Sequence, residues 1–197
     1  MSPALPPPAQ AVLDFWFDGD DGRSRGQPRA EWFRKDRGFD HRIASRFGPW
    51  LEQALAGGLQ DWAATPTGTL ALILVLDQFS RNVHRGSPRA FAGDARALAL
   101  ARGLVSAGED RHLSSLQRWF VYLPFEHAED TAAQDESVRL FTALATEDAR
   151  LVDALDYAHR HREVILRFGR FPHRNAVLGR ASTSEEAAYL ARPDAGF

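Results

Sequence analysis

Four side chains suited to acid–base chemistry follow Pro124 closely, namely Glu126, His127, Glu129 and Asp130. In the helix that we expect to begin just after the proline, the three carboxylates share one face, and their repulsion needs arginines or a metal ion to balance it. We therefore take Glu126 and His127 as candidate catalytic residues and Glu129 as a candidate ligand-binding residue, with a solvated helical face as the structural alternative. We predict no cofactor, and a divalent metal at these four residues is a minor alternative.

A further carboxylate, Asp77, follows the most apolar run of the chain, and Arg81 and Asn82 come one turn later. On a helix, residues four apart can face each other, and a carboxylate beside a buried run needs a partner because an unpaired buried charge is costly. Asp77 is a candidate catalytic residue, and Arg81 and Asn82 are candidate ligand-binding residues. The structural alternative is an ion pair that only anchors the core helix.

His161 lies within an apolar stripe of the C-terminal part of the chain. The stripe has steps of three and four residues and comprises Leu151, Leu155, Ala158, His161, Ile165 and Phe168. This spacing predicts that the His161 side chain is substantially buried. It is either a core histidine with satisfied hydrogen bonds or a catalytic general base whose pKa is tuned by its apolar surroundings.

The stretch from Arg160 to Arg180 contains six arginines and one acid, Glu163, and its densest part runs from 167 to 175. Gly169 and Pro172 indicate a braced, irregular backbone there, which is suited to presenting basic groups to an anion. The candidate ligand-binding residues are Arg167, Arg170, His173, Arg174 and Asn175. Alternatively, or in addition, these arginines neutralise the acidic segment 126–130 or cap helix ends.

Composition narrows the classes of function. The formal net charge of -2 gives no global positive field, so we expect neither nucleic acid nor a membrane surface as a partner. The absence of cysteine excludes disulfides, thiol nucleophiles and Cys-ligated metals. The start of the chain does not resemble a secretory signal, so a cytoplasmic location is the expectation.

Apolar spacing near 3.6 recurs along the chain and alternating strand patterns are missing, which predicts an all-α fold. We expect a single domain over 1–197 of seven to eight antiparallel helices, with a disordered proline-rich segment at 1–8 and a mobile loop at 18–31. The expected helices are 9–17, 40–55 capped by Asp40, 67–82 beginning at Thr67 or Thr69, 88–105 capped by Ser87, 116–123 ended or kinked by Pro124, 125–145, 146–168 ended by Gly169, and 183–190 with a capping box of Ser182 and Glu185.

The motifs together resemble an uncharacterised bacterial and fungal family, domain of unknown function number nine hundred and twenty-four, in the tetratricopeptide-like superfamily. The matching segments are 15–17, 32–33, 76–82, 88–91 with Asp94, 124–127 with 129–130 and Gln134, His161 and Ile165, 167–175, and 178–180 with Thr183 and 185–186. The resemblance implies a helical-hairpin stack in one domain, although no fixed repeat is visible. It carries over no established activity and no catalytic residues.

We hypothesise that these motifs meet in a pocket for a small anionic molecule, a carboxylate or a phosphate. Arginines would orient the ligand, and His127 or His161 would move a proton in a hydrolysis or group transfer. The main alternative is a helical module that binds a protein or peptide without catalysis, which exposed Trp32, Trp62 or Trp119 would favour. A third possibility is a buried ion-pair network with no ligand. The sequence does not decide whether the protein is an enzyme, which ligand it takes, or its oligomeric state.

Overall fold

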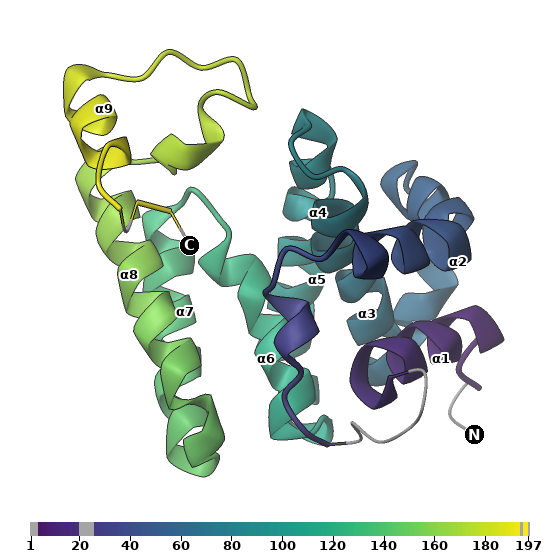
Figure 1. Ribbon diagram of the computed structural model, residues 1–197. Helices are drawn as coiled ribbons and strands as arrows, with labels where there is room; N and C mark the ends of the chain where they lie inside the picture. The colour runs from purple at the N-terminus through teal and green to yellow at the C-terminus, as the bar shows by residue number, and fades with distance from the viewer. Residues whose placement is uncertain (1–3, 20–25, 194, 197) are drawn as a thin grey trace. The chain divides into compact units, whose positions relative to one another are not determined.

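The computed structural model describes residues 4–19, 26–193 and 195–196, and all regular elements within these ranges are helical (Figure 1). The all-α prediction is therefore confirmed. None of the helices in these ranges is long and apolar enough to cross a bilayer.

The chain divides into two compact units. Unit 1 comprises 1–85 and 89–124, and unit 2 comprises 86–88 and 125–197. The helices of unit 1 are α1 (Pro7–Leu13), α2 (Arg37–Leu55), α3 (Pro66–Ile73), α4 (Ser80–Val83), α5 (Asp94–Ser106) and α6 (Ser115–Glu126), whose last two residues belong to unit 2. The helices of unit 2 are α7 (Thr131–Glu147), α8 (Val152–Phe168) and α9 (Ser184–Leu190).

The core of unit 1 is built on the apolar run 70–76, in which every side chain is fully buried. This run is helical throughout, because a π-helical segment, Leu74–Phe79, joins α3 directly to α4. A second π-helical segment, Asp14–Asp18, continues α1 and contributes Phe15, Trp16 and Phe17 to an aromatic cluster. The buried polar residues that follow the apolar run are thus carried on one continuous helical stretch.

Only part of each segment expected to be disordered or mobile is described. Residues 1–3 and 20–25 lie outside the described ranges, whereas Pro7 already begins α1. Within 18–31, the Arg29 guanidinium donates to the main-chain carbonyls of Phe15 and Trp16 at 2.6 and 2.8 Å. These carbonyls end a helical segment, so Arg29 supplies donors that the helix itself lacks.

Several helix starts differ from the predictions because the capping side chain is another residue. Asp36, not Asp40, caps α2 by accepting from the main-chain N–H groups of Gly38 and Phe39. Thr65, not Thr67 or Thr69, caps α3. In both cases the cap is the residue with extended backbone angles directly before the first turn, which is the geometry that N-capping requires.

The predicted helix 88–105 is wrong at its start. Pro88–Phe91 forms a short 3-10 turn, and α5 begins only at Asp94. The break lies at Gly93, whose backbone comes so close to Leu76 that a Cβ atom there would be 2.3 Å from the Leu76 carbonyl oxygen. Tertiary packing therefore decides where this helix begins.

Of the two predicted effects of Pro124, an end or a kink of its helix, the end does not occur, and the predicted new helix start at 125 is wrong. α6 continues through Pro124 to Glu126. The side-chain amide of Gln134 then donates to the carbonyls of Phe125, Glu126 and Ala128 at 3.3, 2.6 and 2.8 Å. Residues 127–130 consequently form a turn between α6 and α7 instead of a helical face.

In unit 2, α7 and α8 pack side by side as an antiparallel hairpin (Figure 1). α8 begins at Val152 and not at Thr146, because α7 extends to Glu147 and Asp148 caps an intervening 3-10 turn. Gly169 ends α8 with a φ of 68°, as predicted. The capping box of α9 is formed by Thr183 and Glu186, one residue later than the predicted pair Ser182 and Glu185.

We expect Gly93→Ala to destabilise the protein by about 2 kcal/mol or more, because the new methyl group collides with the Leu76 carbonyl. Gly103→Ala, in the interior of α5 with open space around the new Cβ, should instead stabilise it by about 1 kcal/mol through helix propensity. Urea denaturation of the two variants checks this. Equal free energies of unfolding for Gly93→Ala and the unsubstituted protein would contradict the packing argument.

Candidate functional site

The predicted site residues fall into two groups, one in each unit. Asp77, Arg81 and Asn82 belong to unit 1, and all the others belong to unit 2.

The polar residues of unit 1 are engaged with one another. The buried Asp77 carboxylate lies 2.9 Å from the Arg81 guanidinium, which also makes two hydrogen bonds to Asp94 at 2.8 and 3.0 Å. Burial by itself would lower the pKa of Arg81, but the carboxylates of Asp77 and Asp94 outweigh it and raise the pKa. Asn82 donates to Asp40 at 2.7 Å. These contacts favour the ion pair that anchors the core helix.

The acidic residues after Pro124 do not share a face, so that prediction is wrong. Glu126 is buried at the end of α6, Glu129 lies in the turn, and Asp130 caps α7 by accepting from the Ala133 N–H at 2.8 Å. The cause is the turn that begins at His127 and separates their directions. In the described parts of the chain, no group of three or more His, Asp or Glu side chains is arranged to hold a metal ion.

His161 is buried, as its place in the apolar stripe predicts, with 6% of its surface exposed. Its Nδ1 lies 2.8 Å from the Tyr157 carbonyl oxygen and 3.3 Å from Glu126 Oε1. A carbonyl can only accept a hydrogen bond, so the neutral ring carries its proton on Nδ1 and Nε2 is the basic nitrogen. The Tyr157 carbonyl thus orients the ring, and the Glu126 carboxyl group lies beside the same nitrogen.

Burial lowers the pKa of His161 well below its usual value, because the apolar surroundings disfavour the imidazolium. His127, Arg174 and His173 act in the same direction, and the Tyr157 carbonyl acts against them. His161 is therefore neutral at pH 7.

Phe171 lies at the centre of the polar groups of unit 2. Its ring centroid is 5.5 Å from those of His161 and His173, and the Arg174 guanidinium carbon lies 4.5 Å from it. The His127 and His161 rings are 6.3 Å apart. We call this set of residues the His161 cluster: Glu126, His127, His161, Phe171, His173 and Arg174.

The interior and the rim of the His161 cluster differ in exposure. Phe171 and Arg174 are 0% and 7% exposed, whereas His173 reaches the surface and His127 is partly exposed. The pKa of His173 is lowered to about 4 by the atoms packed around the ring and by the Arg174 charge. The cluster thus combines a buried guanidinium with imidazoles, of which His161 and His173 are neutral at pH 7.

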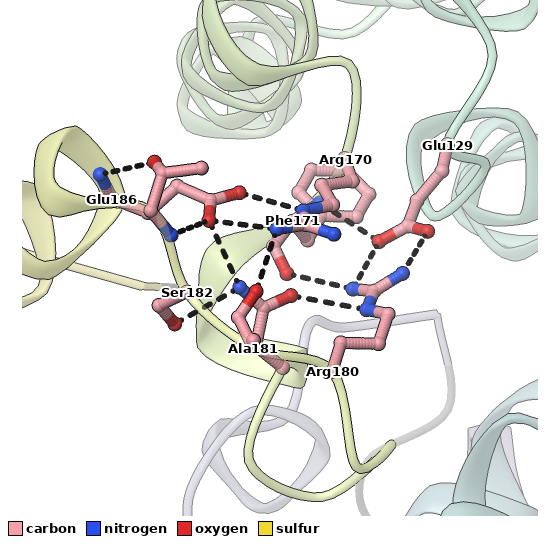
Figure 2. Close-up of polar contacts among 9 residues, drawn as sticks. Glu129, Arg170, Phe171, Arg180, Ala181, Ser182 and Glu186 are labelled. Atoms are coloured by element: carbon pink, nitrogen blue, oxygen red, sulfur yellow. Dashed lines mark hydrogen bonds and ion pairs between the residues drawn. The ribbon is translucent and has the colours of Figure 1, made fainter.

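The other predicted arginines pair with α9. Arg167 lies 2.8 Å from Glu185. Arg170 binds both oxygens of Glu186 at 2.6 and 2.8 Å (Figure 2). The structure therefore brings Arg174 into the His161 cluster and engages Arg167 and Arg170 with acids of the last helix. Neutralisation by arginine was one of our alternatives, although the acids lie mainly outside 126–130.

Glu129 is paired with Arg180, a residue that the sequence analysis did not single out. The two side chains make hydrogen bonds at 2.6 and 2.9 Å, and Glu129 also accepts from the Phe171 N–H at 2.8 Å (Figure 2). Asn175, also a predicted site residue, accepts from Arg180 at 3.0 Å and donates to Ser182 at 3.1 Å. Arg180 stands beyond the densest arginine segment, and no spacing rule links it to a residue 51 positions away.

The neutral state of His161 predicts how stability depends on pH. The unfolded chain binds a proton at His161 near pH 6.5 and the folded protein does not, so stability is lost as pH falls below about 6.5. His161→Gln should reduce the slope of unfolding free energy against pH by up to about 1.4 kcal/mol per pH unit. Urea denaturation from pH 5 to 7 measures the slope, with the exposed His159→Gln as the control. If His161→Gln and the control keep the same slope, His161 is not the group responsible.

Comparisons with known proteins agree with the fold and with the extent of the resemblance. The profile of a family described as bacterial protein of unknown function (DUF924) matches residues 12–194. A solved structure described as a protein of unknown function, ATU0120 from Agrobacterium tumefaciens, is 38% identical with a TM-score of 0.80, over 93% of this chain and 96% of that one. No curated protein matches the chain. The chain belongs to the family of bacterial proteins of unknown function DUF924.

Proposed function

We propose that unit 2 binds a small anionic molecule, a carboxylate or a phosphate, at the His161 cluster. The observation that carries this proposal is the buried Arg174 guanidinium, 4.5 Å from the Phe171 ring centroid, on the same ring that His161 contacts. An arginine fork matches carboxylate and phosphate oxygens, and its attraction to an anion is stronger where water is excluded.

The imidazole rings of the cluster extend the proposed ligand site from the buried Arg174 guanidinium to the surface. Neutral imidazole nitrogens can donate or accept, and His127 and His173 are the members of the cluster with exposed surface. A ligand would enter past these two rings and place its anionic group toward Arg174. All three of these residues belong to unit 2.

The His161–Glu126 pair would supply acid–base chemistry to such a ligand. Glu126 and the Tyr157 carbonyl orient the ring through Nδ1, so Nε2 would accept or return the proton. A bound anion raises the pKa of a neighbouring imidazole, which would bring His161 from its lowered value toward neutral pH. Hydrolysis or group transfer is the reaction class that these groups would serve.

The alternative function, a protein- or peptide-binding helical module, has less support. We expected exposed tryptophans to favour it, but Trp32 and Trp62 are buried. Trp119 is partly exposed and stacks with the exposed Phe33, at 5.0 Å between ring centroids. This one aromatic pair does not define a partner.

Thermal unfolding in the presence of inorganic phosphate, phosphate esters, small carboxylates and divalent metals tests the proposal. A ligand present at 100 times its Kd stabilises the protein by about 2.7 kcal/mol, which raises the midpoint measurably. We expect an anion to raise the midpoint and Arg174→Ala to abolish the effect. The control is Arg162→Ala, since Arg162 forms an exposed ion pair with Asp135 in the same unit.

The outcomes separate the three possibilities. An anion effect lost only in a folded Arg174→Ala variant supports the proposal. No anion effect on the unsubstituted protein, together with unfolding of Arg174→Ala, would identify the cluster as a structural network and overturn the proposal. Stabilisation by metals alone would do so as well.

A further inference from the structure

The main chain of Phe171 is held from both sides by one ion pair. Its N–H donates to Glu129 Oε1 at 2.8 Å, and its carbonyl oxygen accepts from Arg180 Nη2 at 3.1 Å. Glu129 and Arg180 bind each other through two hydrogen bonds, which closes a ring with the main chain of Phe171 (Figure 2). The position of Phe171 therefore depends on residues from the α6–α7 turn and from the segment before α9.

The ion pair has the properties of a fixed structural contact. Each side chain is 25% exposed, and the geometry is that of a two-point arginine–carboxylate pair. Burial would raise the pKa of Glu129, but the hydrogen bonds from Arg180 and from the Phe171 N–H outweigh it and lower the pKa. Glu129 thus stays ionised at neutral pH, and Asn175 accepts a further hydrogen bond from Arg180 at 3.0 Å.

The ring of Phe171 transmits this position to the His161 cluster. The centroid of this ring lies 5.5 Å from the centroids of the His161 and His173 rings. It lies 4.5 Å from the Arg174 guanidinium carbon. Phe171 is fully buried, so a shift of its backbone moves the ring against neighbours that are close-packed. Small displacements of this kind are enough to misplace a ligand-binding group.

We infer that Glu129 and Arg180 are positioning residues of the anion site, which hold Phe171 and, through its ring, Arg174 and His161 in the binding geometry. This inference rests on the proposed function. Neither side chain contacts the ligand in this account, because both oxygens of Glu129 are engaged by Arg180 and by the Phe171 peptide.

Because Glu129 and Arg180 carry opposite charges, removing each in turn distinguishes a positioning role from a direct electrostatic effect on the bound anion. Removing the negative Glu129 would strengthen binding of an anion if only the field mattered, and removing the positive Arg180 would weaken it. If the pair acts through Phe171, both changes weaken binding. Because the two side chains also bind each other, the loss of affinity in the double variant is smaller than the sum of the two single losses.

The experiment uses Glu129→Met, Arg180→Met and the double variant of the full chain, with Arg162→Met as the ion-pair control. Binding of inorganic phosphate and of succinate is measured by calorimetry at pH 7. We expect about tenfold or greater loss of affinity in all three variants and unchanged affinity in the control. NMR titration of the His161 ring supplies a second readout, and its pKa should move toward 6.5 in the same three variants.

Tighter anion binding by Glu129→Met, or an unaltered His161 titration in both single variants, would overturn the positioning role and leave the anion site in place. Binding of neither probe by the unsubstituted protein would remove the proposed function itself. The His161 titration reports the arrangement of the cluster in folded protein without any ligand. A variant that is merely less stable would therefore retain the titration of the unsubstituted protein.

Discussion

The hydrogen bonds of the Gln134 side chain determine the arrangement of the polar groups in unit 2. Its amide donates to the carbonyls of Phe125, Glu126 and Ala128 from the first turn of α7. The first two carbonyls end α6 and the third lies in the turn that follows, so the amide stabilises a helix end just after a proline. The Glu126 side chain then lies beside His161, and Glu129 reaches Arg180. Without this turn, the carboxylates would project together from one helical face.

The helices themselves could be predicted from the sequence because their cause is local. Apolar spacing identified the α7 and α8 segments, and the stripe that contains His161 correctly predicted its burial. Gly169 ends α8 because glycine adopts a positive φ at no steric cost, and this rule depends on one residue alone. Such features need no knowledge of the tertiary structure.

The predictions failed where a distant contact decides the local geometry. Gly93 marks the start of α5 because of the Leu76 carbonyl, and Pro124 is tolerated in α6 where Gln134 serves the carbonyls that follow it. The pairing of Glu129 with Arg180 joins residues 51 positions apart. Many arginines and carboxylates could satisfy the same charge balance, so the sequence predicted that acids and arginines would pair but not which residues form each pair.

The two polar groups differ in the neighbours that surround the central arginine. In unit 1, Arg81 meets the carboxylates of Asp77 and Asp94 directly, and this closed network explains its own burial. In unit 2, the Arg174 guanidinium is buried against the Phe171 ring, and its charge helps to lower the pKa of the Glu129 carboxyl group. Burying ionisable groups usually adds little stability compared with apolar residues of similar volume. An anion bound next to Arg174 would gain from the same low-dielectric surroundings that make the cluster costly to bury.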